Sequence, residues 1–151
     1  MKIKKMNLTE ENGHYLFKGE DLSLKLTHAA FEQLLLFVQN LDLYPKEERF
    51  FRFSIDGKEC SGFLYAFGVD KKNDKDFIWQ CNLSIENALD EKISFIMDPF
   101  SAFYLKEMEM DYLFDDEEDL EGFLVVNKQQ DLFKNKFFTQ EEALVPDFYK
   151  L

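Results

Sequence analysis

The chain has 151 residues and a formal net charge of −12, and 46% of its residues are hydrophobic, with 18 phenylalanines among them. This length and composition supply one domain with a packed core, whereas the acidic balance disfavours nucleic-acid binding, which needs lysine and arginine on one face. No apolar run is long enough to span a bilayer, and none follows the basic N-terminus as a secretory signal requires, so we expect a cytoplasmic protein that binds neither nucleic acid nor membranes.

A β-hairpin is predicted at the N-terminus. Residues 3–8 and 15–18 have the composition of two short strands. Asn12 and Gly13 lie between them, and this dipeptide is typical of the type I′ turn, in which both central residues need a positive φ.

One amphipathic helix is predicted after a third strand. Residues 22–26 alternate between apolar and polar side chains, as a half-buried strand does. The hydroxyl of Thr27 can then accept a hydrogen bond from the first turn of a helix. Apolar side chains follow at intervals of three and four residues, at Phe31, Leu34, Leu35 and Val38. This spacing predicts a helix with one apolar face that ends near Leu41.

From residue 51 onward the pattern is almost wholly that of β-strands. Four segments are predicted as strands, residues 51–55, 63–69, 77–85 and 93–97. The second of them is apolar on both faces, which indicates a strand in the middle of a sheet. Gly57 and Lys58 are expected to turn the chain after the first strand.

The next part of the chain is predicted to hold a short helix and two strands. Asp98 followed by Pro99 is typical of a helix start, because Asp caps the first turn and Pro suits the first helical position. Residues 108–114 alternate as a half-exposed strand, and Gly122 opens the last predicted strand, residues 123–126.

The tail after that strand is expected to pack against the domain. Its apolar side chains are Phe133, Phe137, Phe138, Leu144, Phe148 and Tyr149. They are numerous enough to dock, and a short helix is predicted near residues 140–144.

The two cysteines are too few for a disulfide scaffold. Cys81 shares its strand face with apolar side chains, so we expect it to be buried as a small hydrophobic residue. Cys60 lies in a predicted turn bounded by glycines, with Lys58 and Arg52 near in the sequence, and positive neighbours lower the pKa of a thiol. Cys60 could therefore be a metal ligand, a reactive thiol or an inert turn residue.

No arrangement typical of an enzyme is found, and we predict that the protein is not one. There is no glycine-rich phosphate loop, and no base is placed to activate Cys60 as a nucleophile. Asp98 and Asp111 could be imagined as an acid/base pair, but a helix cap and a structural position explain them better. His14 and His28 are isolated and are expected at the surface.

The densest run of charge is acidic and covers residues 115–119. Carboxylates can bind a hard cation such as calcium, but an EF-hand loop needs Asp or Asn at alternate positions and a glycine, which this run lacks. We therefore expect a solvated hairpin loop.

Several short motifs follow one another in a characteristic order. Residues 27–30, Thr-His-Ala-Ala, open the predicted helix, and residues 60–62, Cys-Ser-Gly, lie between two predicted strands. A further set comes at matching spacing: Asp98, Ser101, Tyr104, Leu105, Asp111, Tyr112, Gly122, Phe123 and Asn127. The ordered set resembles the HesB/IscA-like family, the A-type carriers of iron–sulfur cluster assembly, over about residues 24–127.

The resemblance implies a fold and a domain organisation. The fold is mostly β, a flattened pseudobarrel of two small mixed sheets with one amphipathic helix packed against it. The chain is then a single domain, residues 1–151, with the family core at about 24–127. The hairpin at 1–20 is an N-terminal extension, and residues 128–151 are a C-terminal extension.

The resemblance also implies a chemistry. The family holds an iron–sulfur cluster or iron with three cysteines, one before a Ser-Gly and two in a Cys-Gly-Cys near the C-terminus. This chain matches the first with Cys60 and has no cysteine after Cys81. Cys60 is thus the implied ligand of iron or an iron–sulfur cluster, and no other metal or cofactor site is expected.

Because clusters usually have four thiolate ligands, one Cys60 is not enough. A homodimer would supply two Cys60 thiolates across its twofold axis. The remaining positions would need carboxylates, Cys81 or an external thiol such as glutathione.

Two functions are compatible with these observations. The first is a divergent iron–sulfur cluster assembly or carrier protein with weakened or lost cluster binding, whose partners belong to the assembly machinery. The alternative is a cluster-free protein-binding or regulatory module on the same scaffold, which would bind a protein partner through its acidic, aromatic surface.

Overall fold

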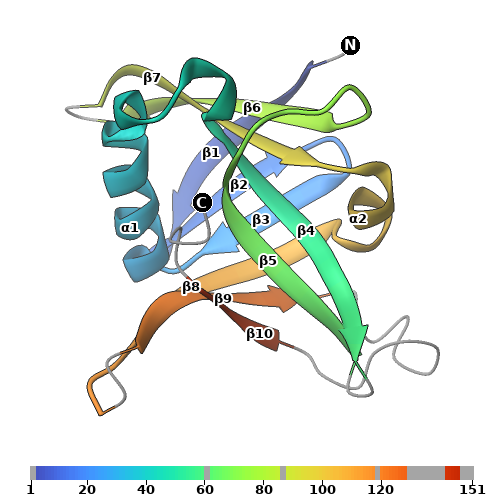
Figure 1. Cartoon of the computed structure of the whole chain (residues 1–151). Coiled ribbons are helices and arrows are strands. Elements are labelled where there is room, and N and C mark those ends of the chain that lie inside the picture. The colour runs from blue at the N-terminus through green and yellow to red at the C-terminus, as the bar shows by residue number, and fades with distance from the viewer. Residues whose placement is uncertain (1–2, 60–61, 86–87, 118–119, 129–141, 147–151) are drawn as a thin grey trace.

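The computed structural model describes residues 3–59, 62–85, 88–117, 120–128 and 142–146 (Figure 1). The strands are β1 (Ile3–Glu11), β2 (His14–Gly19), β3 (Leu22–Leu26), β4 (Phe50–Glu59), β5 (Gly62–Asp70), β6 (Phe77–Ile85), β7 (Ala88–Met97), β8 (Glu107–Asp115), β9 (Leu120–Asn127) and β10 (Glu142–Pro146). The helices are α1 (His28–Gln39) and α2 (Pro99–Tyr104), with short 3-10 turns at Leu41–Leu43 and Lys46–Glu48. No helix among the described residues has the length and apolar character needed to cross a membrane.

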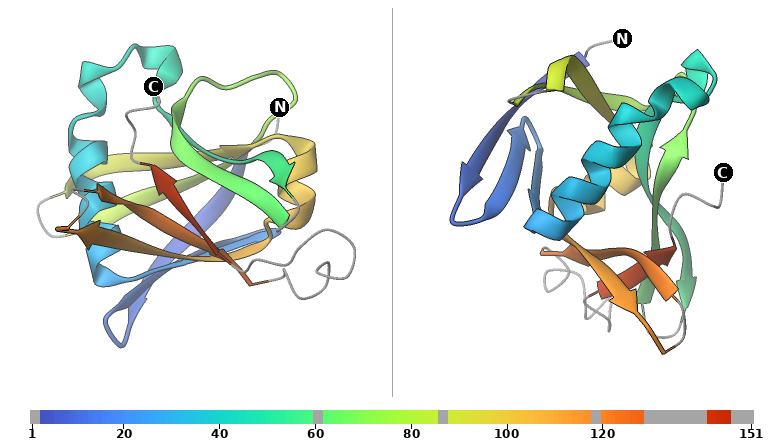
Figure 2. Two further views of the ribbon diagram at one scale, coloured as in Figure 1. Left: turned by 60° about the horizontal axis from the view of Figure 1, so that its bottom comes forward. Right: turned by 90° about the vertical axis from the view of Figure 1, so that its left-hand side faces the viewer.

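Hydrogen bonds join the described strands into one sheet, in the order β10-β9-β8-β3-β2-β1-β6-β7-β4-β5. Three pairs are parallel, β1 with β6, β3 with β8 and β4 with β7, and the others are antiparallel. The end strands β10 and β5 lie close together, so the sheet curls into a nearly closed barrel (Figure 2). Strand β5 is thus an end strand, and the prediction that residues 63–69 lie in the middle of a sheet is wrong. The predicted β-rich pseudobarrel with one packed helix is confirmed, with its two expected sheets joined into one.

The core between the strands is built on Phe95, which has no solvent exposure. Its ring lies 5.4 Å from that of Phe17, 6.2 Å from Phe51 and 5.8 Å from Phe53. Aromatic pairs at such separations stabilise beyond the area that they bury. These contacts tie β2, β4 and β7 together across the barrel.

Helix α1 closes one side of the barrel with the predicted apolar face. Its buried residues are Ala30, Phe31, Leu34 and Val38. The predicted cap is confirmed, since the amide of Ala30 donates to the hydroxyl of Thr27 at 3.2 Å. The ring of Tyr15 stacks on Phe31 with 3.8 Å between centroids, which attaches the helix to β2.

The N-terminal hairpin forms as predicted. Asn12 and Gly13 have φ values of +54° and +80°, as a type I′ turn requires. The hairpin lies within the sheet, because β2 pairs with β3 and β1 pairs with β6. Residues distant in the sequence thus become neighbours through it.

The predicted turn at Gly57 and Lys58 is wrong. Strand β4 continues through both residues to Glu59, and the register with β5 shifts at a bulge between Ile55 and Gly57. A bulge absorbs an extra residue while the ladder continues. The connection therefore falls at residues 60–61, which lie outside the described residues.

The predicted helix near residues 140–144 is also wrong. Strand β10 pairs antiparallel with β9, and Leu144 lies opposite Leu124. Strand β9 itself begins at Leu120, two residues before Gly122. The edge of β9 offers unpaired backbone groups, and pairing with them outweighs the local helical pattern.

Candidate functional site

The candidate ligand Cys60 lies outside the described residues, between the end of β4 and the start of β5. Glu59 ends β4 and Gly62 begins β5, and these two residues face each other as an antiparallel pair. They form the far end of a two-stranded arm, which we call the β4–β5 arm and which runs from the top of the barrel to its lower right in Figure 1. Among the described residues, β4 pairs with β7 only at Phe51 and Arg52.

Helix α2 holds the middle of this arm. The hydroxyl of Ser101 accepts a hydrogen bond from the amide of Ile55 at 3.1 Å, at the start of the bulge in β4. Asp98 caps α2 as predicted: one carboxylate oxygen accepts from the amide of Ser101 at 2.7 Å, and the other accepts from its hydroxyl at 3.1 Å. Ser101 is fully buried, so this network fixes the position of β4 at Ile55.

A second network holds β5. The hydroxyl of Tyr65 hydrogen-bonds to the side chain of Asn127, whose amide nitrogen also donates to the carbonyl of Tyr104 at 3.2 Å. Burial raises the pKa of Tyr65 to about 12, although the bond from Asn127 acts in the opposite direction. Tyr65 is therefore neutral at physiological pH and acts as a hydrogen-bonding link between β5, β9 and α2.

Asp111 links the start of helix α1 to β8. Its Oδ1 accepts from the hydroxyl of Thr27 at 2.7 Å and from the amide of Tyr112 at 2.8 Å. Because Thr27 also caps α1, these bonds attach the start of the helix to β8. Asp98 and Asp111 are thus both engaged in anchoring helix starts.

Arg52 does not act on Cys60 in the way that the sequence suggested. Its guanidinium donates to Asp76 Oδ1 at 2.9 Å and to Asp70 Oδ2 at 2.7 Å. This cluster lies at the opposite end of β4 from Glu59, on the order of 20 Å away along the strand. The expected positive neighbour of the thiol is therefore neutralised and distant.

Asp76 is the buried member of this cluster and was not singled out from the sequence. Burial alone would raise the pKa of its carboxyl, but the hydrogen bonds and charge of Arg52 and the amide of Asn73 outweigh it, and the net pKa is lowered. A signal was available: Asp76 directly precedes the apolar strand β6, where a lone acidic residue needs a partner.

Cys81 is buried with 2% of its surface exposed, as predicted. Burial raises the pKa of its thiol, so the thiolate that binds metal is disfavoured. Cys81 lies opposite Ile93 of β7, near the level at which Phe95 pairs with Phe51 of β4. From this level to Glu59, at the end of the β4–β5 arm, the distance along the strands is on the order of 30 Å. Cys81 is therefore not placed to share a metal with the Cys60 of the same chain.

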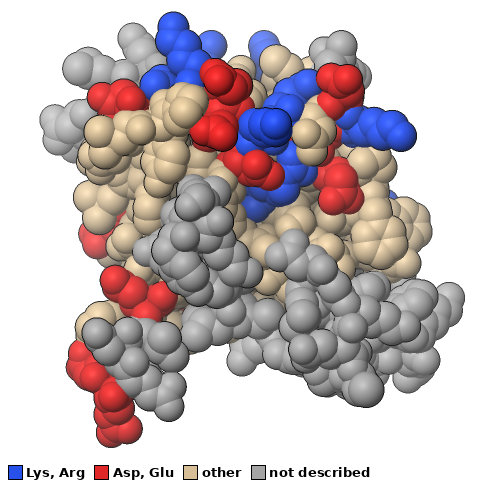
Figure 3. Space-filling model, viewed as in Figure 1, with Lys and Arg blue, Asp and Glu red and all other residues tan. Residues whose placement is uncertain are grey.

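The two histidines and the acidic loop, which the sequence placed at the surface, lie apart from one another. His28 is exposed and pairs with Glu32 at 2.6 Å, and His14 is half-buried beside the hairpin turn. Asp116 and Glu117 are exposed, and Figure 3 shows acidic side chains at the end of the β8–β9 hairpin, at lower left. Within the described ranges, no three His, Cys, Asp or Glu side chains are grouped closely enough to hold a metal ion.

Comparisons with known proteins identify the scaffold. No family model matches the chain. It is 34% identical over 112 residues, 73% of its length and 84% of the relative's, to the iron-sulfur cluster insertion protein ErpA of Blochmanniella floridana. It is 33% identical over 110 residues, 71% and 83% of the two lengths, to the protein of the same name from Colwellia psychrerythraea. These relatives are A-type carriers, and the chain therefore belongs to the HesB/IscA-like family.

Proposed function

We propose that this protein is a divergent carrier in iron–sulfur cluster insertion and that Cys60 is the residue that binds its cargo. The similarity to two insertion proteins, over most of both chains, supports the carrier role over a cluster-free module. The observation that carries the assignment to Cys60 concerns the other cysteine: Cys81 is buried in the core with a raised thiol pKa. The sequence holds no third cysteine.

The same observation supports a weak hold on the cargo. With Cys81 buried, one chain offers at most the thiolate of Cys60, whereas a cluster usually has four. Two chains related by a twofold axis would offer two, and a small thiol could complete the set. Carboxylates are harder ligands and suit magnesium, calcium or manganese better than a sulfide cluster. The protein would therefore pass iron or a cluster on readily, which suits a carrier.

The proposed partners are proteins, namely the assembly machinery that supplies the cargo and the targets that receive it. The proposed compartment is the cytoplasm, where thiols stay reduced. We propose no chemical transformation by the protein itself, because the role consists of binding and release.

Anaerobic reconstitution tests the proposal. The protein is incubated with iron and sulfide, with and without glutathione, and then separated by gel filtration with iron and visible absorbance measured across the peaks. We expect iron and absorbance in the dimer fraction or in the presence of glutathione. The Cys60→Ser variant should lose both, and the matched Cys81→Ala variant, which also removes one thiol, should retain them.

Three outcomes would contradict parts of the proposal. A stable cluster on the monomer would show that the hold is not weakened. Iron retained by the Cys60→Ser variant would show that the site lies elsewhere. No bound iron in any fraction, with or without glutathione, would refute the carrier role.

A further inference from the structure

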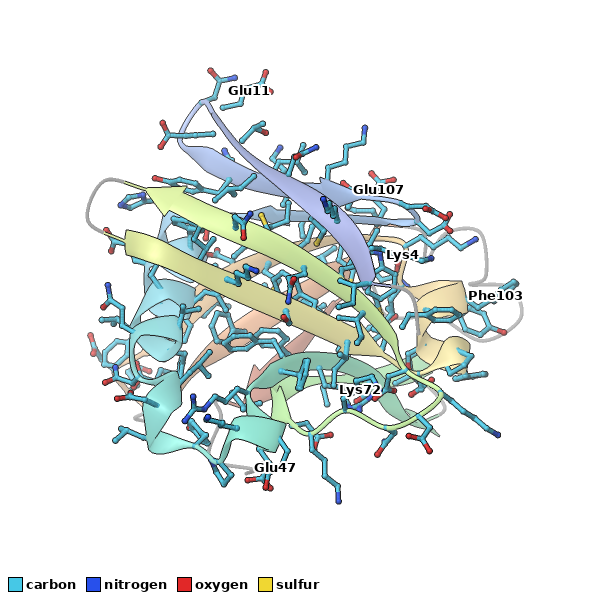
Figure 4. All side chains as sticks on the ribbon, turned by 90° about the horizontal axis from the view of Figure 1, so that it is seen from above. Lys4, Glu11, Glu47, Lys72, Phe103 and Glu107 are labelled. Atoms are coloured by element: carbon cyan, nitrogen blue, oxygen red, sulfur yellow. The ribbon has the colours of Figure 1, made fainter. Side chains whose placement is uncertain are left out.

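Strands β1 and β6 separate partway along their length. They pair only from Ile3 opposite Ile78 to Met6 opposite Cys81. Beyond this point β1 stays with β2 as far as Glu11, whereas β6 stays with β7. Figure 4 shows the result: Lys4 lies where the two strands run side by side, and Glu11 lies at the tip of the hairpin, away from β6.

The fork between β1 and β6 is a groove of about 770 Å³. Polar side chains from β1, β6 and β7 contribute to its lining, among them Lys5, Asn7, Thr9, Gln80, Asn82 and Lys92. Lys5 faces Gln80 in the ladder, and Lys92 faces Asn82. The groove therefore lies between the edges of β1 and β6, and side chains of both strands line it.

The β1 edge of the groove carries backbone groups that the described strands leave unpaired. In a two-residue hairpin, the residues next to the turn, Glu11 and His14, form a hydrogen-bonded pair, and such pairs alternate along the ladder. Thr9 and Asn7 are thus bonded to β2, while the N–H and C=O groups of Leu8 and Glu10 point into the fork. An open edge of this kind accepts an added strand.

The charge of the groove favours an acidic occupant. Lys5 and Lys92 are both exposed there, in a chain whose net charge is −12. The acidic side chain in the lining, Glu10, accepts a hydrogen bond from the hydroxyl of Tyr15. Neither lysine forms an ion pair within the described part of the chain, so both can pair with a carboxylate of the occupant.

We propose that this groove binds an extended segment of a partner protein, which adds as a strand to the open edge of β1 and places a carboxylate side chain next to Lys5 and Lys92. The free edge covers about four residues, roughly 13 Å, so the segment is short. The site is independent of Cys60, and its test does not depend on whether the protein binds iron.

A displayed library of linear random dodecapeptides, selected against the wild-type protein, tests the proposal. We expect enrichment of peptides with an acidic residue among alternating side chains. The best peptide is then synthesised together with two derivatives, one methylated at alternate backbone nitrogens and one with its acidic residue changed to lysine. Fluorescence anisotropy measures the binding of all three.

Two sets of variants separate backbone pairing from charge. Glu10→Pro removes the N–H that points into the fork and leaves the bonds to β2 intact, while Glu10→Gln removes the same charge and keeps the N–H. We expect the affinity of the Glu10→Pro variant to be about fivefold below that of the Glu10→Gln variant, since the two differ in the N–H and not in the charge. The double variant Lys5→Glu/Lys92→Glu should weaken the acidic peptide about tenfold and favour its lysine derivative. Circular dichroism confirms that each variant is folded.

The results that would overturn the proposal are equally concrete. Failure to enrich any peptide would show that the lysines only guard an open edge against aggregation. Equal binding of the methylated peptide would exclude strand addition. Equal binding of the acidic and lysine peptides to the wild-type protein would exclude the role of Lys5 and Lys92.

Discussion

The β6–β7 pair contains Cys81, whereas the β4–β5 arm ends at Glu59 and Gly62, next to Cys60 in the sequence, and the two pairs differ in their surroundings. The β6–β7 pair lies between β1 and β4, whereas β5 ends the sheet. Trp79, Cys81 and Leu83 are therefore all buried, while the arm is held at Ile55 by a hydrogen bond to Ser101 of α2. The comparison teaches that Cys81 is buried in a pair with strands on both sides, whereas the arm next to Cys60 includes the end strand β5.

The largest effect is expected at the centre. Phe95→Ala should lower the free energy of unfolding by about 4 kcal/mol, because it removes a fully buried ring that joins β7 to β2 and β4. Urea unfolding followed by tryptophan fluorescence measures this change. Phe114→Ala is the matched control, since Phe114 is 60% exposed, and it should cost under about 0.5 kcal/mol. Equal losses would mean that the centre is no more closely packed than the hairpin end.

The next effect concerns the inner end of the arm. Asp76→Ala should cost about 3 kcal/mol, because it leaves the guanidinium of Arg52 without its buried partner. The exposed neighbour Asp74 provides the control, and Asp74→Ala should leave the unfolding midpoint nearly unchanged. A loss below about 1 kcal/mol at Asp76 would show that water or Asp70 compensates.

The same cluster predicts a dependence on pH. The pKa of Asp76 is lowered in the folded protein, so its charge stabilises the fold above the unfolded-state pKa of about 3.9, and this contribution is lost as the pH falls through the folded value. The difference in unfolding free energy between wild type and Asp76→Asn should therefore be largest near pH 6 and shrink below pH 4. A constant difference across this range would contradict the assignment.

A smaller effect is expected where α2 meets the arm. Ser101→Ala removes the acceptor of the Ile55 amide and should cost about 1–2 kcal/mol. Ser94→Ala, which removes one side-chain bond with Gln80, should cost less than about half as much. If the two variants unfold alike in urea, the anchoring of the arm by Ser101 is not supported.

The smallest perturbation is chemical labelling, which tests the comparison directly. A thiol reagent at neutral pH should modify Cys60 first, because Cys81 is buried and its raised pKa disfavours the thiolate. Mass spectrometry of peptides assigns the modified residue at each time point. Cys81 should react only when urea unfolds the protein, and faster reaction at Cys81 in the native protein would reverse the comparison.

Local patterns in the sequence were sufficient for most of the fold. Alternating side chains located the strands, and the caps at Thr27 and Asp98 located both helix starts. The bulge at Ile55 and strand β10 could not be predicted in this way, because each depends on pairing with another strand, and local side-chain patterns do not identify the pairing partner.

The candidate site was predictable to a similar depth. The motif at residues 60–62 singled out Cys60, and side-chain alternation placed Cys81 in the core, which the structure confirms. The partners of Arg52 were missed because Asp70 and Asp76 approach it from another strand and a loop. The fork between β1 and β6 is likewise a product of long-range pairing.

The parallel pairs constrain how the chain can fold during synthesis. The β1–β6 ladder cannot form until Ile78, the partner of Ile3, has been synthesised. The β3–β8 ladder likewise requires Glu107, the partner of Ser23. At about 5–20 residues per second, a ribosome needs several seconds to deliver each partner. Strands β1 and β3 therefore each lack one neighbour, and α1 lacks its contact with β8, until the later strands are made. We expect slow folding dominated by non-local contacts, with the barrel closing only late in translation.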